Sequence, residues 1–164
     1  MVEAGLNFQG PQAAAVLRDW GADVIKVELP GVGDQSRSLP AAPDDERSGY
    51  FIACNQGKRS VTIDLRQPAG SEVFLRLTEK TDVVITNFRP GTMESWGLGY
   101  EGLAERNSGV IYGMGSTFGP RGPDAQREGT RPGWSLPSPF RADRPQANRG
   151  RRVPLPDLGT TRAR

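Results

Sequence analysis

Lysine and arginine side chains recur beside turns that contain glycine or proline between residues 31 and 91. Arg37 follows a loop with two glycines, and Arg89 lies in the segment NFRPG. Lys58 and Arg59 directly follow Gly57. Turn amides with a nearby cation are suited to binding phosphate. Each cation taken alone is typical of a solvated surface, but their shared placement favours a phosphate-bearing ligand.

The sequence has no histidine and a single cysteine, Cys54. Without histidine, no Ser-His or Cys-His nucleophile pair can form, and the common histidine-based metal sites are excluded. We therefore expect no metal. The lone cysteine excludes an intrachain disulfide framework and is typical of a reducing compartment. No apolar run approaches the roughly 18 residues that span a bilayer, and no signal-peptide pattern begins the chain. These features predict a cytoplasmic protein with no membrane partner.

The charge is unevenly distributed along the chain. Residues 1–128 contain 13 Lys and Arg against 17 Asp and Glu, whereas residues 129–164 contain eight Arg against two Asp. The last 36 residues also contain six Pro and four Gly, which oppose helix interiors and central strands. We predict a domain over 1–128 and an irregular, divergent or disordered tail over 129–164. Because the tail has no regular basic face and only two aromatics, we expect no nucleic-acid partner.

Short β-like runs alternate with helical stretches across residues 1–128, which is the pattern of a parallel sheet with crossover helices. The predicted fold class is therefore α/β, a Rossmann-like parallel sheet that is truncated and followed by the irregular tail. Strands are predicted at Met1–Ala4, Asp23–Val27, Val61–Leu65, Val83–Thr86 and Val110–Met114, with a short extended piece at Tyr50–Ala53. Helices are predicted over residues 11–23, Pro68–Lys80 and Tyr100–Arg106.

Local signals support these helices. Pro11 suits a first helical turn, and Gly21 suits a helix C-cap. The spacing of Val16, Leu17 and Trp20 places them on one helix face. In the helix that begins at Pro68, the pattern predicts that Val73, Phe74 and Leu77 point inward. Ligands of parallel sheets bind at the carboxyl ends of the strands, so the loops that follow the strands are the candidate site.

Three separate blocks carry a resemblance to a known family. They are GADVIKVELPGVGDQSR at 21–37, NQGKRSVTIDLRQPAG at 55–70 and DVVITNFRPGTMESWGLGY at 82–100. In this order and spacing they resemble the class III CoA transferases, which include formyl-CoA transferase and the L-carnitine dehydratase/bile-acid-inducible protein F group. The resemblance covers residues 1–128. It implies transfer of coenzyme A from an acyl-CoA to a free carboxylic acid, with CoA bound along the Rossmann-like domain of an interlocked homodimer.

The resemblance also implies roles for individual residues. Arg37, from the turn-and-cation pattern, joins the predicted CoA-binding set. The positions that match CoA-contacting residues of the family are Phe8, Gln9, Ile63, Asp64, Leu65, Arg66, Asn87, Phe88, Arg89, Glu128, Gly129, Thr130 and Arg131. Ile63 to Arg66 match a segment that borders the nucleotide. Leu29 and Ser95 stand where the family often has an arginine that assists CoA binding.

The segment VPLPDLGT, 153–160, resembles the family strand that ends at the nucleophilic aspartate, which makes Asp157 the predicted catalytic residue. In the implied mechanism this carboxylate attacks the thioester and forms a mixed anhydride. The released CoA thiolate then attacks the anhydride and leaves an aspartyl-CoA thioester. The acceptor carboxylate repeats these steps in reverse. The family continues with a second domain, which contains its glycine-rich loop and much of the dimer interlock.

Other readings stay open. The chain is alternatively a CoA-binding module without turnover, or an inert fragment with exposed apolar helix faces. A racemase of the same fold is disfavoured, because that relative uses a histidine. The segment TRPGWSLPSPF, 130–140, cannot form the helix that the family has there. Our hypothesis is a reading-frame disturbance across residues 130–150 and a second near Thr160, which re-reading the coding DNA would test.

Overall fold

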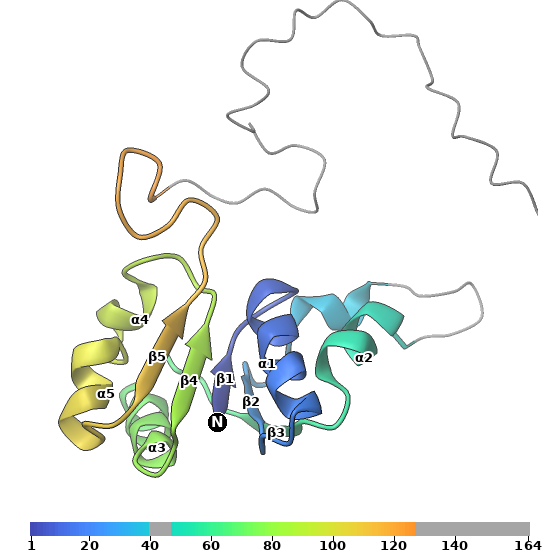
Figure 1. The fold of residues 1–164 in the computed structure, drawn as a ribbon, viewed down its shortest axis with the longest axis horizontal. Helices are drawn as coiled ribbons and strands as arrows, with labels where there is room; N and C mark the ends of the chain where they lie inside the picture. Colours follow the sequence, from blue (N-terminus) through green and yellow to red (C-terminus); the bar gives the residue numbers. More distant parts are fainter. Residues whose placement is uncertain (40–46, 127–164) are drawn as a thin grey trace, which may run out of the picture. The chain divides into compact units, whose positions relative to one another are not determined.

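The computed structural model describes residues 1–39 and 47–126. Five parallel strands form one sheet in the order β3-β2-β1-β4-β5 (Figure 1). The predicted α/β class with a parallel sheet and crossover helices is confirmed. The strands are β1 (Val2–Ala4), β2 (Ile25–Glu28), β3 (Arg59–Thr62), β4 (Val83–Thr86) and β5 (Ile111–Met114).

Helices pack on the two faces of this sheet. On one face α1 contacts α2, β1 and β4, and on the other α3 contacts α5 (Figure 1). The helices are α1 (Gln9–Asp19), the 3-10 turn η1 (Gln35–Ser38), α2 (Gly49–Asn55), α3 (Pro68–Thr78), α4 (Thr92–Ser95) and α5 (Tyr100–Arg106). Within the described residues, no helix is long and apolar enough to cross a bilayer.

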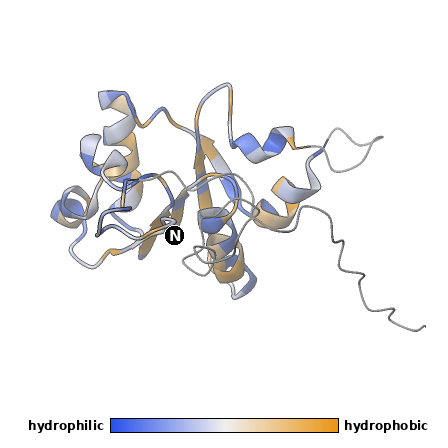
Figure 2. Cartoon of the chain, turned by 90° about the horizontal axis from the view of Figure 1, so that it is seen from above, coloured by the Kyte–Doolittle hydropathy of each residue, from blue (hydrophilic) through white to orange (hydrophobic). Residues whose placement is uncertain are grey.

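Alternation along the strands divides the interior into an apolar half and a charged half. Val2 and Ala4 point toward α3, α4 and α5, where they join a core built around Phe74, Met93 and Leu103. Glu3, between them, points to the other face and pairs in register with Lys26 of β2. Successive strand residues face opposite sides of a sheet. Figure 2 shows hydrophobic residues concentrated along the central strands.

Two element predictions and one cap prediction were accurate. Strand β4 and helix α5 have the predicted bounds. Helix α1 spans Gln9–Asp19 instead of the predicted 11–23, but Gly21 follows it in the left-handed region at φ +98°, as predicted for its C-cap. The amides of Gly21 and Ala22 then bond back to the carbonyls of Arg18 and Leu17, as a glycine C-cap requires.

The prediction of an extended piece at Tyr50–Ala53 was wrong. These residues lie in helix α2, because the Ser48 hydroxyl caps the first turn by accepting the Phe51 amide at 3.1 Å. Strand β3 also begins and ends earlier than predicted. Its pairing with β2 starts at Arg59, which lies opposite Ile25. Beyond Thr62 only the Ile63 amide continues the pairing, by donating to the Glu28 carbonyl.

The structure shows which faces of α1 and α3 are buried, and the prediction that Val73 points inward was wrong. Helix α1 buries Gly10, Pro11, Ala14 and Ala15, while Trp20 is 82% exposed. Small residues let this helix approach the sheet closely, and the larger side chains of Val16 and Trp20 face outward. In α3, Phe74 is fully buried and Val73 is 48% exposed. Leu77 packs against the core as predicted.

Candidate functional site

A pocket of about 200 Å³ opens at the carboxyl ends of β1, β2 and β3. Its apolar walls include Leu29 and Val32 after β2, together with Phe88 and Trp96 after β4. The rings of Phe88 and Trp96 meet edge to face, with 5.5 Å between their centroids. The predicted residues that line this pocket are Ile63, Asp64, Leu65, Arg66 and Phe88.

The segment that follows β3 is held firmly against helix α3. Arg66 wraps back onto Asp64, with its Nε and Nη2 atoms 2.8 and 2.9 Å from the two carboxylate oxygens. The pKa of Asp64 is lowered by this side-chain pairing. A Cβ atom on Gly70 would lie only 2.0 Å from the Asp64 carbonyl oxygen. Glycine at this position therefore permits the close approach that shapes the wall of the pocket.

Arg37 does not line the pocket, but it pairs with Glu28, which does. Its Nε and Nη2 atoms donate to the two Glu28 oxygens at 2.9 and 2.8 Å, and its guanidinium stacks 3.8 Å from the Phe51 ring centre. Ser60 and the Asp34 amide also donate to Glu28. Burial alone would raise the pKa of Glu28, but these hydrogen bonds hold it below its usual value. Two donors of Arg37 are thus committed, and its phosphate contact stays a prediction.

Phe8 and Gln9 lie at the start of helix α1. This helix covers the face of the sheet opposite to the apolar core. Phe8 is 53% exposed, and its ring centroid is 6.0 Å from that of Tyr50. The Gln9 side chain packs against the backbone at Gly115, so closely that a Cβ there would be 2.8 Å from Gln9 Cδ. The predicted residues therefore fall into two groups, one that lines the pocket and one, Phe8 and Gln9, at the start of α1. Asn87 and Arg89 lie on the loop after β4.

The phosphate role predicted for Lys58 and Arg59 was wrong. The Lys58 side chain is 2% exposed, and its Nζ donates to Glu3, the Pro11 carbonyl and Asn55 at 2.8 to 3.0 Å. These three acceptors use every hydrogen of the ammonium group. Arg59 begins β3 at the amino ends of the strands, away from the pocket, and pairs there with Asp23.

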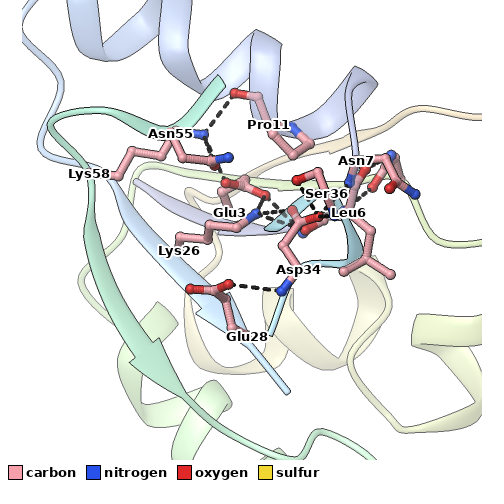
Figure 3. Close-up of polar contacts among 12 residues, drawn as sticks. Glu3, Leu6, Asn7, Pro11, Lys26, Glu28, Asp34, Ser36, Asn55 and Lys58 are labelled. Carbon is pink, nitrogen blue, oxygen red and sulfur yellow. Dashed lines mark hydrogen bonds and ion pairs between the residues drawn. The ribbon is translucent and has the colours of Figure 1, made fainter. Parts of the chain in front are cut away.

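Sequence reasoning missed a buried ion network beneath the site (Figure 3). Lys26 Nζ lies 3.0 Å from Glu3 Oε1 and 2.9 Å from Asp34 Oδ2, and all three side chains are almost fully buried. Burial alone would raise the pKa of Asp34, but hydrogen bonds from Ser36 and Lys26 lower it. The sequence did contain a signal for this network. Two buried strands carry charged residues on one face, namely Glu3 in β1 and Lys26 and Glu28 in β2.

The lowered pKa values of Glu28 and Asp34 predict a loss of stability in acid. The folded state holds these groups ionised below the usual value of 4.5 for Glu28, so the unfolded state binds more protons there. The contribution of the ionised Glu28 to the free energy of unfolding is then fully present above pH 4.5 and declines as the pH falls through the folded pKa. Urea unfolding between pH 6 and pH 3 should show a shallower decline for Glu28→Gln than for the wild type. Glu105→Gln, an exposed change of equal charge, is the control, and a Glu28→Gln curve parallel to the wild type would contradict the prediction.

Residues Glu128 to Arg131 and Asp157 lie outside the described residues. The same holds for the predicted boundary after residue 128, which stays a prediction. In the part of the chain that the structure describes, no group of three or more Cys, Asp or Glu side chains is placed to hold a metal ion.

Comparison with known proteins identifies the class. The model of CoA-transferase family III matches residues 1–132, and the chain belongs to this family. The chain is 42% identical over 129 residues to succinyl-CoA–D-citramalate CoA-transferase of Chloroflexus aurantiacus, covering 79% of this chain and 32% of that protein. It is 46% identical over 125 residues to succinyl-CoA:mesaconate CoA-transferase of Haloarcula hispanica, covering 73% and 31%.

Solved structures agree with this assignment. A hypothetical protein from Mycobacterium tuberculosis matches at 42% identity with a TM-score of 0.71, over 79% of this chain and 35% of that one. A CAIB/BAIF family protein from Brucella suis matches at 42% identity with a TM-score of 0.72, over 78% and 35%. The chain spans about a third of the length of the relatives it matches.

Proposed function

We propose that this chain carries part of the CoA site of an enzyme that transfers coenzyme A from an acyl-CoA thioester to a free carboxylic acid. The observation that supports this proposal is the pocket at the carboxyl ends of the strands. In a chain of CoA-transferase family III, it is lined by Ile63 to Arg66 and Phe88, the positions that were predicted to border CoA.

The pocket suits the nucleotide end of CoA. Its apolar walls, with Leu29 and Val32 on one side and the Phe88–Trp96 pair on the other, can enclose a planar base. Arg66 is 58% exposed on its side chain, so its cation lies where a phosphate can reach it. Leu29, in the place where the family often has arginine, removes one cation from this wall. We propose that the apolar walls supply most of the affinity for the nucleotide.

In the proposed reaction Asp157 attacks the acyl-CoA carbonyl, the carbon–sulfur bond breaks, and a mixed anhydride and a CoA thiolate form. The thiolate then attacks the aspartyl carbonyl and releases the donor acid, which leaves aspartyl-CoA. The acceptor acid reverses both steps, so no water, metal or redox cofactor is consumed. We further propose that the protein acts as a cytoplasmic homodimer and that its N-terminal Rossmann-like part extends through residue 128.

A specific observation favours a second candidate function, a CoA-binding module without turnover. Glu28 and Asp64, the two carboxylates in the described pocket, are each bonded to an arginine. Neither is available as a free nucleophile. The described residues therefore account for binding, and turnover depends on Asp157.

Leu29→Trp is expected to weaken CoA binding at least about tenfold, because the larger ring fills the pocket between Leu29 and Trp96. Isothermal titration of CoA into the full chain measures this effect. Ile111→Trp adds the same ring at an exposed position of β5 and should bind CoA as the wild type does. Equal affinity for all three proteins would contradict the proposed location of the nucleotide.

Label transfer separates the two candidate functions. The chain is incubated with an acyl-CoA and a labelled free acid, and the labelled thioester is measured. Transfer that disappears in Asp157→Ala, while CoA binding persists, supports the enzyme. CoA binding without transfer in the wild type supports the binding module, and absence of both contradicts the proposed function.

A further inference from the structure

The loop between β1 and α1 has its backbone groups bonded to side chains from several other elements. Glu3 Oε1 accepts the Gly5 amide at 3.1 Å, and Lys26 Nζ donates to the Gly5 carbonyl at 3.0 Å. Asp34 Oδ1 accepts the Asn7 amide at 3.1 Å. Side chains of the buried ion network therefore hold this loop at Gly5 and at Asn7 (Figure 3).

Asn87 completes this set of contacts from the loop after β4. Its Oδ1 accepts the Leu6 amide and its Nδ2 donates to the Leu6 carbonyl, both at 2.8 Å. This pair of bonds repeats the pattern by which a neighbouring strand would pair with Leu6. Because Ala4 is the last residue of β1 and pairs in register with Thr86, the Asn87 side chain continues the β1–β4 ladder beyond both strand ends.

Glycines lie on both sides of this amide, and the contact is tighter at Gly5 than at Gly10. A Cβ on Gly5 would lie 2.9 Å from Asn87 Oδ1, and a Cβ on Gly10 would lie 3.2 Å from the same atom. The sequence thus provides the space that the Asn87 side chain occupies. The amide faces the loop backbone, packed between β1 and the first turn of α1.

The contacts accompany an unusual backbone conformation in the loop. Asn7 has a φ of +62°, in the left-handed region that asparagine adopts more readily than other non-glycine residues. Such a conformation persists where surrounding contacts determine it. The next residue, Phe8, is consequently displayed to solvent against Tyr50, and Gln9 begins helix α1.

We propose that Asn87 and Asp34 are positioning residues, which set the conformation of the Gly5–Phe8 loop and so present Phe8 and Gln9 to the ligand. This inference rests on the proposed CoA site. It assigns Asn87 a role that differs from the ligand contact implied by the family resemblance. The Asn87 side chain acts through Leu6, and the ion network acts through Gly5 and Asn7.

The test combines amide hydrogen exchange with CoA titration on the full chain. In Asn87→Ala, exchange at the Leu6 and Asn7 amides should rise about tenfold or more, because the bonded acceptor at Leu6 is lost. Amides within β2 and β4 should keep their protection. CoA affinity should fall about tenfold as the loop loses its fixed conformation.

Asn107→Ala is the matched control. Asn107 is also a half-buried asparagine that bonds backbone groups, donating to the carbonyls of Thr78 and Thr81 at the far end of α3. Its removal should cost similar stability and leave both Leu6 exchange and CoA affinity unchanged. Gly10→Ala provides a second variant for the case in which Asn87→Ala does not fold, because its methyl group displaces the Asn87 amide by only a few tenths of an ångström.

The outcomes are distinguishable. Unchanged exchange at Leu6 in both site variants overturns the positioning role. Raised exchange with unchanged CoA affinity overturns the link between the loop and the ligand. A wild-type chain that does not bind CoA contradicts the proposed function instead, and the exchange measurement then still decides whether Asn87 fixes the loop.

Discussion

Lys26→Met is expected to lower the free energy of unfolding by about 3–5 kcal/mol. The Lys26 ammonium lies between Glu3 and Asp34, and the three side chains are almost completely buried. Methionine retains the apolar stem and much of the volume but removes the charge. Glu3 keeps Lys58 as a partner, whereas Asp34 loses its ion pair with Lys26 and stays buried. Urea denaturation at pH 7 measures the change.

Arg59→Gln is the matched control, because it removes a cation from the exposed Arg59–Asp23 pair. This variant should cost less than about 1 kcal/mol, since exposed ion pairs contribute little to stability. Adding Asp34→Asn to Lys26→Met should recover part of the loss by removing the unpaired negative charge. Equal losses for Lys26→Met and Arg59→Gln would show that burial of the network does not determine its energetic role.

Phe74→Ala is expected to destabilise the protein by about 3–5 kcal/mol, because it removes a fully buried ring and leaves a cavity. Phe74 lies on α3 and packs in the apolar core between this helix and the sheet. The same core supports Ile63 and Leu65, which line the pocket. Thermal and urea unfolding measure the loss.

Val73→Ala, one position earlier, is the control for this prediction. Because Val73 is 48% exposed, its truncation should cost less than about 1 kcal/mol. The helical periodicity of the sequence placed both residues inward, and the structure places only Phe74 there. A Val73→Ala loss equal to that of Phe74→Ala would contradict the orientation of α3 on the sheet.

Much of the fold follows from local patterns. The bounds of β4 and α5 and the glycine cap of α1 were predicted from apolar runs and turn residues. The error at α2 has a physical origin, since a short apolar run of Tyr50 to Ala53 is compatible with either strand or helix. The Ser48 cap and contacts of α2 with α1 and η1 determine that it is helical.

The site was predictable to a similar extent. The family resemblance named Ile63 to Arg66 and Phe88, and the structure brings these residues to one pocket. The cationic turns were less informative. Arg37 and Lys58 looked alike in sequence, yet Arg37 is partly exposed and pairs with the pocket residue Glu28, while Lys58 is buried beneath α1. Exposure of a long cationic side chain depends on which elements cover it, and that is not a local property.

The sequence by itself determined the family and the alternation of strands and helices. It also placed charged residues at Glu3 and Lys26 among apolar neighbours. Only the tertiary structure decided that these charges meet Asp34 and Lys58, and that Asn87 pairs with Leu6. The physical reason is that ion pairing and hydrogen bonding require groups within about 3–4 Å. Residues distant in the chain reach that separation only through sheet register and loop conformation.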